Sequence, residues 1–212
     1  MFITFEGIEG SGKTMQIIRA HTYLREKGFR CLLTREPGGT DFGLALRSVL
    51  LGTESCRREA VCELLLYLAD RVQHLKEVIE PALKQGLLVL SDRYQDATRA
   101  YQGAARGIPA AEIERLTQLL GIFEPDKTVL LDLDPQEGLA RARLRNQTIP
   151  SAGAEGRFEA EDLAFHKRVR AAYLDLAAQF PERIRIVQAS GSPDEVFSRI
   201  MPLLDEWMLT AP

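Results

Sequence analysis

The chain lacks several features that mark particular classes of protein. Its three cysteines, Cys31, Cys56 and Cys62, are odd in number and have no CxxC spacing, which argues against a disulfide framework and a zinc site. No apolar run approaches the ~20 residues that span a bilayer, and no basic segment opens the N-terminus. We therefore expect no contact with a membrane and a location in the reducing cytoplasm.

Positive charge is not in excess either. The 212 residues include 27 Lys and Arg against 30 Asp and Glu, which gives a net charge of −3. Proteins that coat nucleic acids need a basic surface, because much of their affinity comes from phosphate contacts. We therefore expect no nucleic acid among the partners. The length suits one good-sized core, and we expect a single domain over residues 1–212.

Short apolar runs alternate with amphipathic stretches along the chain. Runs of about five apolar residues are typical of strands buried on both faces of a parallel sheet, and they cover Phe2–Glu6, Phe29–Thr34, Leu87–Ser91, Thr128–Leu133 and Ile184–Gln188. Helical spacing covers Lys13–Lys27, Asp41–Leu51, Arg58–Lys84, Ala110–Leu120, Pro135–Arg145, Glu159–Phe180 and Pro193–Met208. The alternation predicts an α/β fold, a doubly wound five-stranded parallel sheet with helices on both faces. Active sites of such folds lie at the carboxyl ends of the strands.

One of these strand ends carries a glycine-rich motif. Between the strand ending at Glu6 and the helix beginning at Lys13, the chain reads Gly7, Ile8, Glu9, Gly10, Ser11, Gly12, Lys13 and Thr14. This is the pattern and the context of a phosphate-binding loop (P-loop), so we expect a fold of the P-loop NTPase type that binds ATP. Lys13 should reach the β- and γ-phosphates from an exposed position, and Thr14 should offer its hydroxyl to Mg²⁺. A dinucleotide fingerprint is disfavoured, because Met15 stands where it needs a small residue.

Other residues indicate which kind of P-loop protein this is. An Asn-Lys-x-Asp motif, which reads guanine, is missing, and no Glu stands beside the strand-end acid to position a water. Asp92 and Arg93 follow the third strand instead, where the acid can hold Mg²⁺ and the arginine can clamp a phosphate. A simple strand-end ion pair is the alternative. These features favour a kinase over a GTPase or a remodelling ATPase.

Arginines also gather near a segment rich in glycine and proline. Arg141, Arg143 and Arg145 precede residues 146–156, which read as a loop. A mobile lid at about 141–158 would bring positive charge over the γ-phosphate and exclude water. A solvated helix face is the alternative explanation for these arginines.

Taken together, the motifs resemble those of bacterial thymidylate kinase, the dTMP kinase of the nucleoside monophosphate kinase group. The resemblance is carried by residues 5–14, Arg35-Glu36-Pro37-Gly38-Gly39-Thr40, Leu66-Tyr67-Leu68-Ala69-Asp70-Arg71, Asp92-Arg93-Tyr94, Ala100-Tyr101-Gln102-Gly103 and Arg157-Phe158-Glu159. It implies phosphorylation of dTMP to dTDP with ATP and Mg²⁺ in dTTP synthesis, by a homodimer. The alternatives are a P-loop kinase for another nucleotide or nucleoside, dUMP included, and a nucleotide-dependent switch or assembly ATPase.

The resemblance also implies roles by position. Tyr67, where the family usually has Phe, would stack on thymine, Arg71 would read a thymine carbonyl, and Thr98 would contact the base. Tyr101 would lie under the sugar, and Gln102 belongs to the same substrate-binding motif. The remaining roles fall to Arg35 and Arg93 as clamps of the dTMP phosphate, Glu9 near its sugar and phosphate, and Arg141 and Arg143 as lid arginines; Lys13, Glu9, Arg93, Arg141 and Arg143 form the catalytic set.

The helix at 58–84 supports two of these expectations independently. Tyr67, Arg71 and His74 share a face at i, i+4 and i+7, away from the main leucine stripe, as suits a base pocket. A surface tyrosine on an arginine stem is the alternative, and we expect His74 at the helix surface or an interface. Because the helix is apolar over more than one stripe, we also expect a subunit interface there.

The chain departs from the family pattern at two positions. Met15 replaces the usual Thr, and we expect an effect on packing only. Gly156 stands where an acid often precedes Arg157, and Glu155 or Glu159 could replace that acid.

Overall fold

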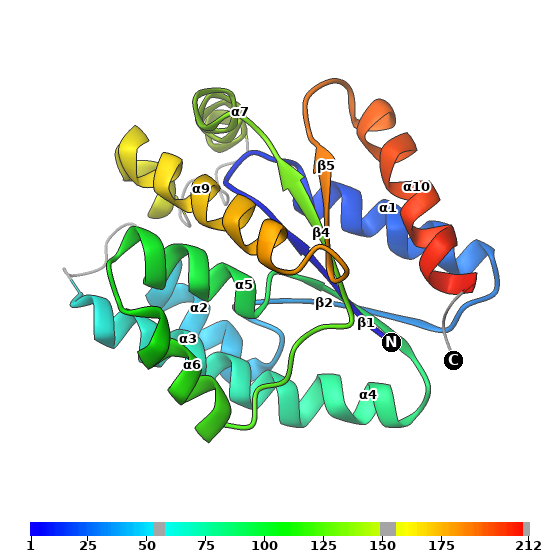
Figure 1. Cartoon of the computed structure of the whole chain (residues 1–212), viewed down its shortest axis with the longest axis horizontal. Coiled ribbons are helices and arrows are strands. Elements are labelled where there is room, and N and C mark those ends of the chain that lie inside the picture. Colours follow the sequence, from blue (N-terminus) through cyan, green and yellow to red (C-terminus); the bar gives the residue numbers. More distant parts are fainter. Residues whose placement is uncertain (53–57, 149–155, 210–212) are drawn as a thin grey trace.

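The protein is described here from a computed structural model, over residues 1–52, 58–148 and 156–209 (Figure 1). Its core is one five-stranded sheet made of β1 (Phe2–Glu6), β2 (Cys31–Arg35), β3 (Leu88–Asp92), β4 (Lys127–Asp132) and β5 (Ile184–Gln188). The strands lie in the order β2-β3-β1-β4-β5, and every pair is parallel. The predicted fold class is confirmed.

Helices cover both faces of this sheet (Figure 1). One face carries α1 (Lys13–Glu26) and α10 (Pro193–Leu209), and the other carries α3 (Ala60–His74), α4 (Glu80–Lys84) and α9 (Leu163–Gln179). The remaining helices are α2 (Asp41–Leu51), which packs on α3, α5 (Gln95–Thr98), α6 (Ala110–Leu119) and α7 (Pro135–Thr148). No helix in the described ranges is long and apolar enough to cross a membrane.

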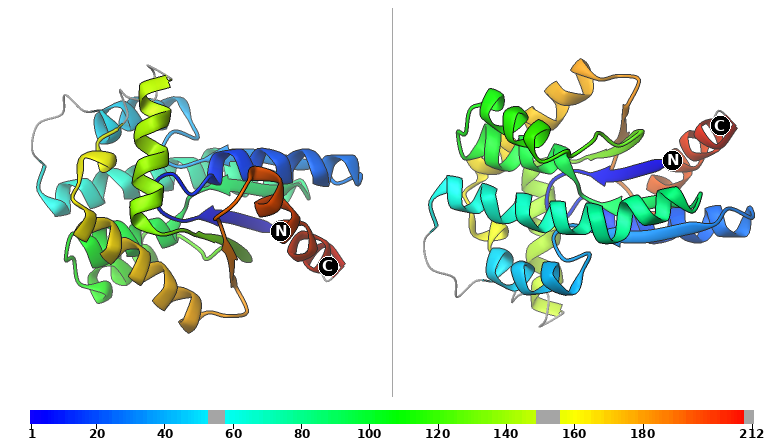
Figure 2. Two further views of the ribbon diagram at one scale, coloured as in Figure 1. Left: turned by 90° about the horizontal axis from the view of Figure 1, so that it is seen from above. Right: turned by 90° about the horizontal axis from the view of Figure 1, so that it is seen from below.

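Strand β1 lies at the centre of the sheet, and its five residues are all buried. The register pairs Phe5 with Asp92 and Glu6 with Leu130. This pairing brings the chain that leaves β1 at Gly7 next to the ends of β3 and β4. In the left view of Figure 2, α7 stands crosswise to α1 near these strand ends. The sequence motifs thus gather at the carboxyl edge of the sheet, as expected for a parallel sheet.

The long helix predicted at 58–84 begins at Ala60 and contains an irregular middle. It consists of α3, a π-helical segment η1 (Leu75–Ile79) and α4. Pro81 has no N–H to donate back to the preceding turn, and a wider turn absorbs the missing bond. The distortion expected in the last turn therefore lies just before the proline.

Other boundaries also differ from the predictions. Helix α7 runs to Thr148, so residues 146–148 are helical and not loop. The helix predicted from Glu159 is interrupted, because a 3-10 turn η3 (Phe158–Ala160) comes first and Asp162 then caps α9 by accepting from the N–H of Phe165. Edge strand β2 is only half buried and starts two residues late, which leaves Phe29 outside it.

No helix was predicted where the structure has α5 and the π-helical segment η2 (Arg99–Ala105) that continues it. Their inward positions are largely polar, with Gln95, Asp96, Thr98 and Gln102 all buried. An apolar stripe is the signal for a buried helix, and this helix lacks one. Its polar side chains are buried because they bond to other elements.

Candidate active site

Two of the P-loop glycines, Gly7 and Gly10, are required by close contacts as well as by the loop backbone. Gly7, Gly10 and Gly12 all have positive φ, at 142°, 73° and 86°. A Cβ on Gly7 would lie 2.5 Å from the carbonyl oxygen of Leu131 in β4, and one on Gly10 would lie 2.0 Å from that of Gly138 in α7. Neither position can take a larger residue, so both β4 and α7 approach the loop backbone closely.

Lys13 is buried, which contradicts the expectation of an exposed position. Its side chain folds back over the loop, where Nζ donates to the carbonyl oxygen of Ile8 at 2.7 Å and to Ser11 Oγ at 3.4 Å. The residue is 8% exposed. Burial, together with the positive charge of Arg93, lowers the pKa of Lys13 to about 8. A desolvated cation held by neutral oxygens stands to gain from an anion at this position.

Thr14 and Asp92 meet at the first turn of α1. The Thr14 hydroxyl donates to Asp92 Oδ2 at 2.5 Å. The described residues hold no group of three or more His, Cys, Asp or Glu that could bind a metal alone. Mg²⁺ is commonly held by one or two protein oxygens, with phosphate oxygens and waters completing the shell. This hydroxyl and carboxylate fit such a site.

Arg93 is the centre of the site. Its Nη2 donates to Glu9 Oε1 at 2.9 Å and to the Tyr101 hydroxyl at 3.1 Å, and its Nη1 to the Tyr173 hydroxyl at 3.3 Å. The Tyr101 hydroxyl also donates to Glu9 Oε1 at 2.6 Å. Glu9, Arg93 and Tyr101 therefore form one hydrogen-bonded cluster. Glu9 is far from the other two in the sequence.

Two buried carboxylates of this region differ in their ionisation. Burial raises the pKa of Glu6 to about 7, although Arg93 opposes the shift. Burial would also raise the pKa of Glu9, but the nearby His166 and the charges of Arg93 and Lys13 outweigh it and hold the pKa well below its usual range. Glu9 is therefore an anion that faces two cations.

The sequence did not single out Glu6, Tyr173 or His166 as parts of the site. Glu6 accepts from the Tyr94 N–H and from the Tyr173 hydroxyl, both at 2.7 Å. Nδ1 of the buried His166 lies 3.2 Å from Glu9 Oε2. Tyr173 and His166 come from α9, and only the packing of that helix on the sheet brings them here. Glu6 was open to detection as the acid that ends the strand before the P-loop.

Arg71 and Thr98, both assigned to the base by the resemblance, lie together in a buried position. Arg71 Nη1 donates to Thr98 Oγ1 and to Gln95 Oε1, each at 2.7 Å. Its other bonds go to Glu36 Oε2 at 2.7 Å and to the carbonyl oxygen of Tyr94 at 3.0 Å. The alternative, a surface tyrosine packed on an arginine stem, is wrong, because Arg71 is only 1% exposed.

His74 contradicts its prediction as well. It is 0% exposed and bonds to Glu36 and Thr34, so it does not lie at the helix surface or an interface. The polar face of α3 is buried because the loop after β2 covers it, a contact that helical spacing cannot show. Tyr67, one turn before Arg71, is partly buried against the main core.

Gln102 is buried and bonded to a carboxylate that the sequence did not indicate. Its Nε2 donates to Glu63 Oε1 at 2.9 Å. Glu63 also pairs with Arg106 at 3.3 Å and, through Oε2, with Arg157 at 2.5 Å. In this structure Gln102 therefore bonds to the first turn of α3.

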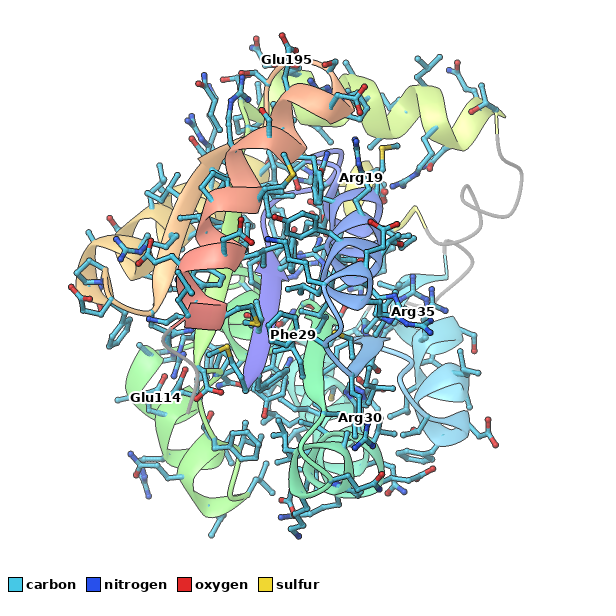
Figure 3. The ribbon with its side chains drawn as sticks, turned by 90° about the vertical axis from the view of Figure 1, so that its right-hand side faces the viewer. Arg19, Phe29, Arg30, Arg35, Glu114 and Glu195 are labelled. Carbon is cyan, nitrogen blue, oxygen red and sulfur yellow. The ribbon has the colours of Figure 1, made fainter. Side chains whose placement is uncertain are left out.

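The arginines assigned to phosphates lie on different elements. Arg35 ends β2 and is exposed; in the view of Figure 3 it is drawn between the ribbons of α1 and α2. On α7, Arg141 donates to the carbonyl oxygen of Ala189 at 3.1 Å and to Glu137 at 2.6 Å, while Arg143 is exposed. The structure does not bring these three side chains to the Arg93 cluster.

Much of the predicted lid falls outside the described residues. Residues 149–155 lie there, including Glu155 and most of the expected loop. Glu159 pairs with Arg145 at 2.7 Å. Mobility of the lid and replacement of the missing acid stay predictions.

Comparisons of the sequence and the structure with known proteins relate this chain to one family. A family model described as thymidylate kinase matches residues 5–200. A thymidylate kinase of Oleidesulfovibrio alaskensis is 52% identical over 202 residues, which cover 94% of this chain and 95% of that protein. One of Syntrophotalea carbinolica is 49% identical over 211 residues, 99% of this chain and 94% of that protein. A crystal structure of thymidylate kinase from Ehrlichia chaffeensis superposes with a TM-score of 0.76 at 32% identity and covers 96% of this chain and 98% of that one.

Proposed function

Because this chain belongs to the thymidylate kinase family, we propose that it transfers the γ-phosphoryl group of ATP to the phosphate of dTMP, giving dTDP for dTTP synthesis. One observation carries the assignment of the site. Glu9 of the P-loop bonds to Arg93, and both bond to Tyr101. The element that would hold the donor thereby touches the elements that would hold the acceptor.

On the donor side, residues 7–14 would bind the triphosphate through backbone N–H groups and the N-terminus of α1. Lys13 would move from the carbonyl oxygen of Ile8 to the β- and γ-phosphates, gaining an anionic partner for a buried cation. Thr14 and Asp92 would hold Mg²⁺. When bound there, Mg²⁺ would neutralise charge on the phosphate oxygens.

On the acceptor side, Arg71 would donate to a thymine carbonyl, with Thr98 beside it, and Tyr67 would stack on the ring. Tyr101 would lie under the sugar, and Glu9 would lie near it. Gln102 would act from behind this pocket, through its bond to Glu63. Arg93 and Arg35 would hold the dTMP phosphate.

The transfer itself needs no general base in this proposal. A dTMP phosphate oxygen is already an anionic nucleophile, so the chain has to align the two substrates and neutralise charge. Arg93 would do this from the acceptor side. Arg141 and Arg143 would do so from the lid at about 141–158, which would also exclude water.

We further propose that residues 1–212 act as one kinase domain, in the cytoplasm, as a homodimer. Support for the dimer comes from α3, where Val61 and Leu65 are 55% and 51% exposed. Exposed apolar side chains that recur on one helix face are typical of an interface. Support for a reducing compartment comes from the thiols of Cys31 and Cys62, which are free.

A coupled assay of ADP release over a panel of acceptors tests the function. We expect dTMP to give the highest kcat/KM among dTMP, dUMP, dCMP, other nucleoside monophosphates and thymidine. One methyl group is worth only ~1–3 kcal/mol, so the advantage over dUMP should be modest. Equal rates for all acceptors would contradict dTMP as the substrate. ATP hydrolysis that no acceptor accelerates would favour the switch or ATPase alternative, which family membership disfavours.

A further inference from the structure

The loop that follows β2, residues 36–40, is seated on α3 by three contacts. Glu36 reaches both Arg71 and His74. The N–H of Gly38 donates to Asp70 Oδ1 at 3.0 Å. A Cβ on Gly39 would lie 2.3 Å from the His74 ring, so that ring packs directly on the glycine backbone. The loop and the helix face are therefore built for each other.

Within this contact, a chain of hydrogen bonds leads from β2 to Arg71. Thr34 Oγ1 lies 2.6 Å from His74 Nε2, His74 Nδ1 lies 2.9 Å from Glu36 Oε1, and Arg71 Nε donates to Glu36 Oε2 at 2.7 Å. An ionised carboxylate only accepts, so His74 Nδ1 must carry a hydrogen. Nε2 of a neutral ring then accepts from the Thr34 hydroxyl. Glu36, His74 and Arg71 are all fully buried, so solvent does not compete for these bonds.

These hydrogen bonds leave the Arg71 side chain little freedom to move. Four of the five N–H groups of a guanidinium are engaged by Glu36, Gln95, Thr98 and the carbonyl oxygen of Tyr94. The bond from Nε fixes the plane of the group, because Nε lies at its base. A guanidinium has only donor groups. Held in this way, it cannot turn aside to accommodate another donor.

We propose that Glu36 and His74 are positioning residues that set base selectivity through Arg71. The inference rests on the proposed function, in which Arg71 donates to a thymine carbonyl. Thymine has carbonyls at C2 and C4, and we take Arg71 to donate to the one at C4, where cytosine carries an amino group, which also donates. A fixed arginine repels the amino group, whereas an arginine free to move away tolerates it. Selectivity for dTMP over dCMP should thus depend on the buried hydrogen bonds of His74 and Glu36 that hold Arg71.

Two substitutions of one residue separate positioning from simple packing. In His74→Asn the amide nitrogen can replace Nδ1 and donate to Glu36, whereas in His74→Gln the amide lies nearer the place of Nε2 and Thr34. We expect His74→Gln to raise KM for dTMP and to lower the dTMP/dCMP ratio of kcat/KM, each by roughly 10-fold, as for a lost hydrogen bond to a charged group. KM for ATP should not change. His74→Asn should keep most of the ratio.

Gln73→Ala, at an exposed position beside His74 on α3, serves as the matched control and should keep the ratio. Equal ratios in the Asn and Gln variants would overturn the proposal, as would a rise in KM for ATP that matches the rise for dTMP. If His74→Gln does not fold, as judged by its thermal melt, Glu36→Gln replaces it and should show the same fall in the ratio. An unchanged ratio in Glu36→Gln would also overturn the proposal.

A double-mutant cycle tests whether His74 acts through Arg71. In an Arg71→Ala background, His74→Gln should cause no further loss of selectivity, because the group that it positions is gone. A full additional loss would show that His74 acts independently, and would refute the inference. A wild-type chain that does not phosphorylate dTMP would refute the proposed function instead, so the two failures are distinguishable.

Discussion

Arg93 adopts a left-handed backbone conformation, with φ of 72°, at the point where Glu9, Tyr101 and Tyr173 converge. A residue with a Cβ adopts this conformation only where its surroundings hold it there. Here the N–H of Arg93 donates to the carbonyl oxygen of Phe5 at 3.0 Å, and the side chain is held by three partners. Backbone strain is thus kept at the residue that joins the two halves of the site.

Lys13, like Arg93, is held in an unfavourable state at the site: its charge is buried. At neutral pH its buried cation lowers the stability of the folded chain, since burial lowers its pKa to about 8. We expect Lys13→Met to reduce kcat by ~10²–10³-fold, as for loss of an electrostatic group in the transition state. The melting temperature of the ligand-free protein should hold or rise, because an apolar side chain of similar length replaces a desolvated charge.

Steady-state kinetics and thermal melts with and without ATP check this outcome. ATP should stabilise the wild type more than the variant, because ligand that binds the folded state raises its stability. Lys84→Met, at an exposed position of α4, is the control and should keep both kcat and the ATP-dependent shift. An unchanged kcat in Lys13→Met would contradict the assignment of the P-loop.

Among the elements, α7 is anchored to the P-loop by two facing glycines. A Cβ on Gly138 would lie 2.5 Å from the carbonyl oxygen of Glu9, and one on Gly10 would meet Gly138 itself. Helix α7 carries Arg141 and Arg143 and leads into the proposed lid. Contact between two glycine backbones therefore sets where the lid arginines begin, a role that the sequence did not reveal for Gly138.

Helix α3 has two functions in our proposal, one on each side. Its inner face holds Arg71 and His74, and its outer face exposes Val61 and Leu65. We expect Leu65→Glu to convert the dimer into a monomer, because a charge at an apolar interface loses its hydration without gaining a partner. Sedimentation velocity measures the change.

Leu119→Glu on α6, where the side chain is 81% exposed, is the matched control and should leave the dimer intact. A wild-type chain that sediments as a monomer would contradict the proposed dimer. So would a Leu65→Glu variant that remains dimeric at low protein concentration.

For the whole molecule, buried carboxylates should shape the dependence of stability on pH. The native pKa of Glu6 is raised to about 7 by burial, from an ordinary value of 4.5. Between these values the native state binds more protons than the unfolded state, so the free energy of unfolding falls as pH rises. The stability that the protonated Glu6 side chain preserves is fully present below about pH 4.5 and is lost above about pH 7. Its size is at most about 3 kcal/mol.

Glu6→Gln should remove this loss. We expect the stability of the variant, relative to wild type, to increase between pH 4.5 and 7.5 in urea unfolding experiments. The pKa of Asp70 is raised to about 6 by burial and by the charge of Glu36, so it acts in the same direction and is present in both proteins. Glu26→Gln, at an exposed position of α1, is the control. A relative stability that does not change with pH would contradict the raised pKa of Glu6.

What the sequence determined by itself is local. The order of strands and helices follows from apolar spacing, and the P-loop follows from eight consecutive residues, because both are written in neighbouring positions of the chain. The family resemblance assigned Arg71 and Thr98 to the base, and Arg93, Glu9 and Tyr101 to the sugar and phosphate of dTMP. In the structure the residues of each set bond to one another. Their binding roles remain our proposals.

Only the tertiary structure decided which polar groups are buried and with what partners. Lys13 was expected to be exposed as part of the loop, and His74 by its helical spacing. In the structure the folded loop covers Lys13 and the segment after β2 covers His74. The raised pKa of Glu6, the bonds that fix Arg71 and the contact of Gly10 with Gly138 all arise between elements far apart in sequence. Burial and partner geometry depend on how those elements pack, and hydrophobic periodicity along the chain carries no information about that.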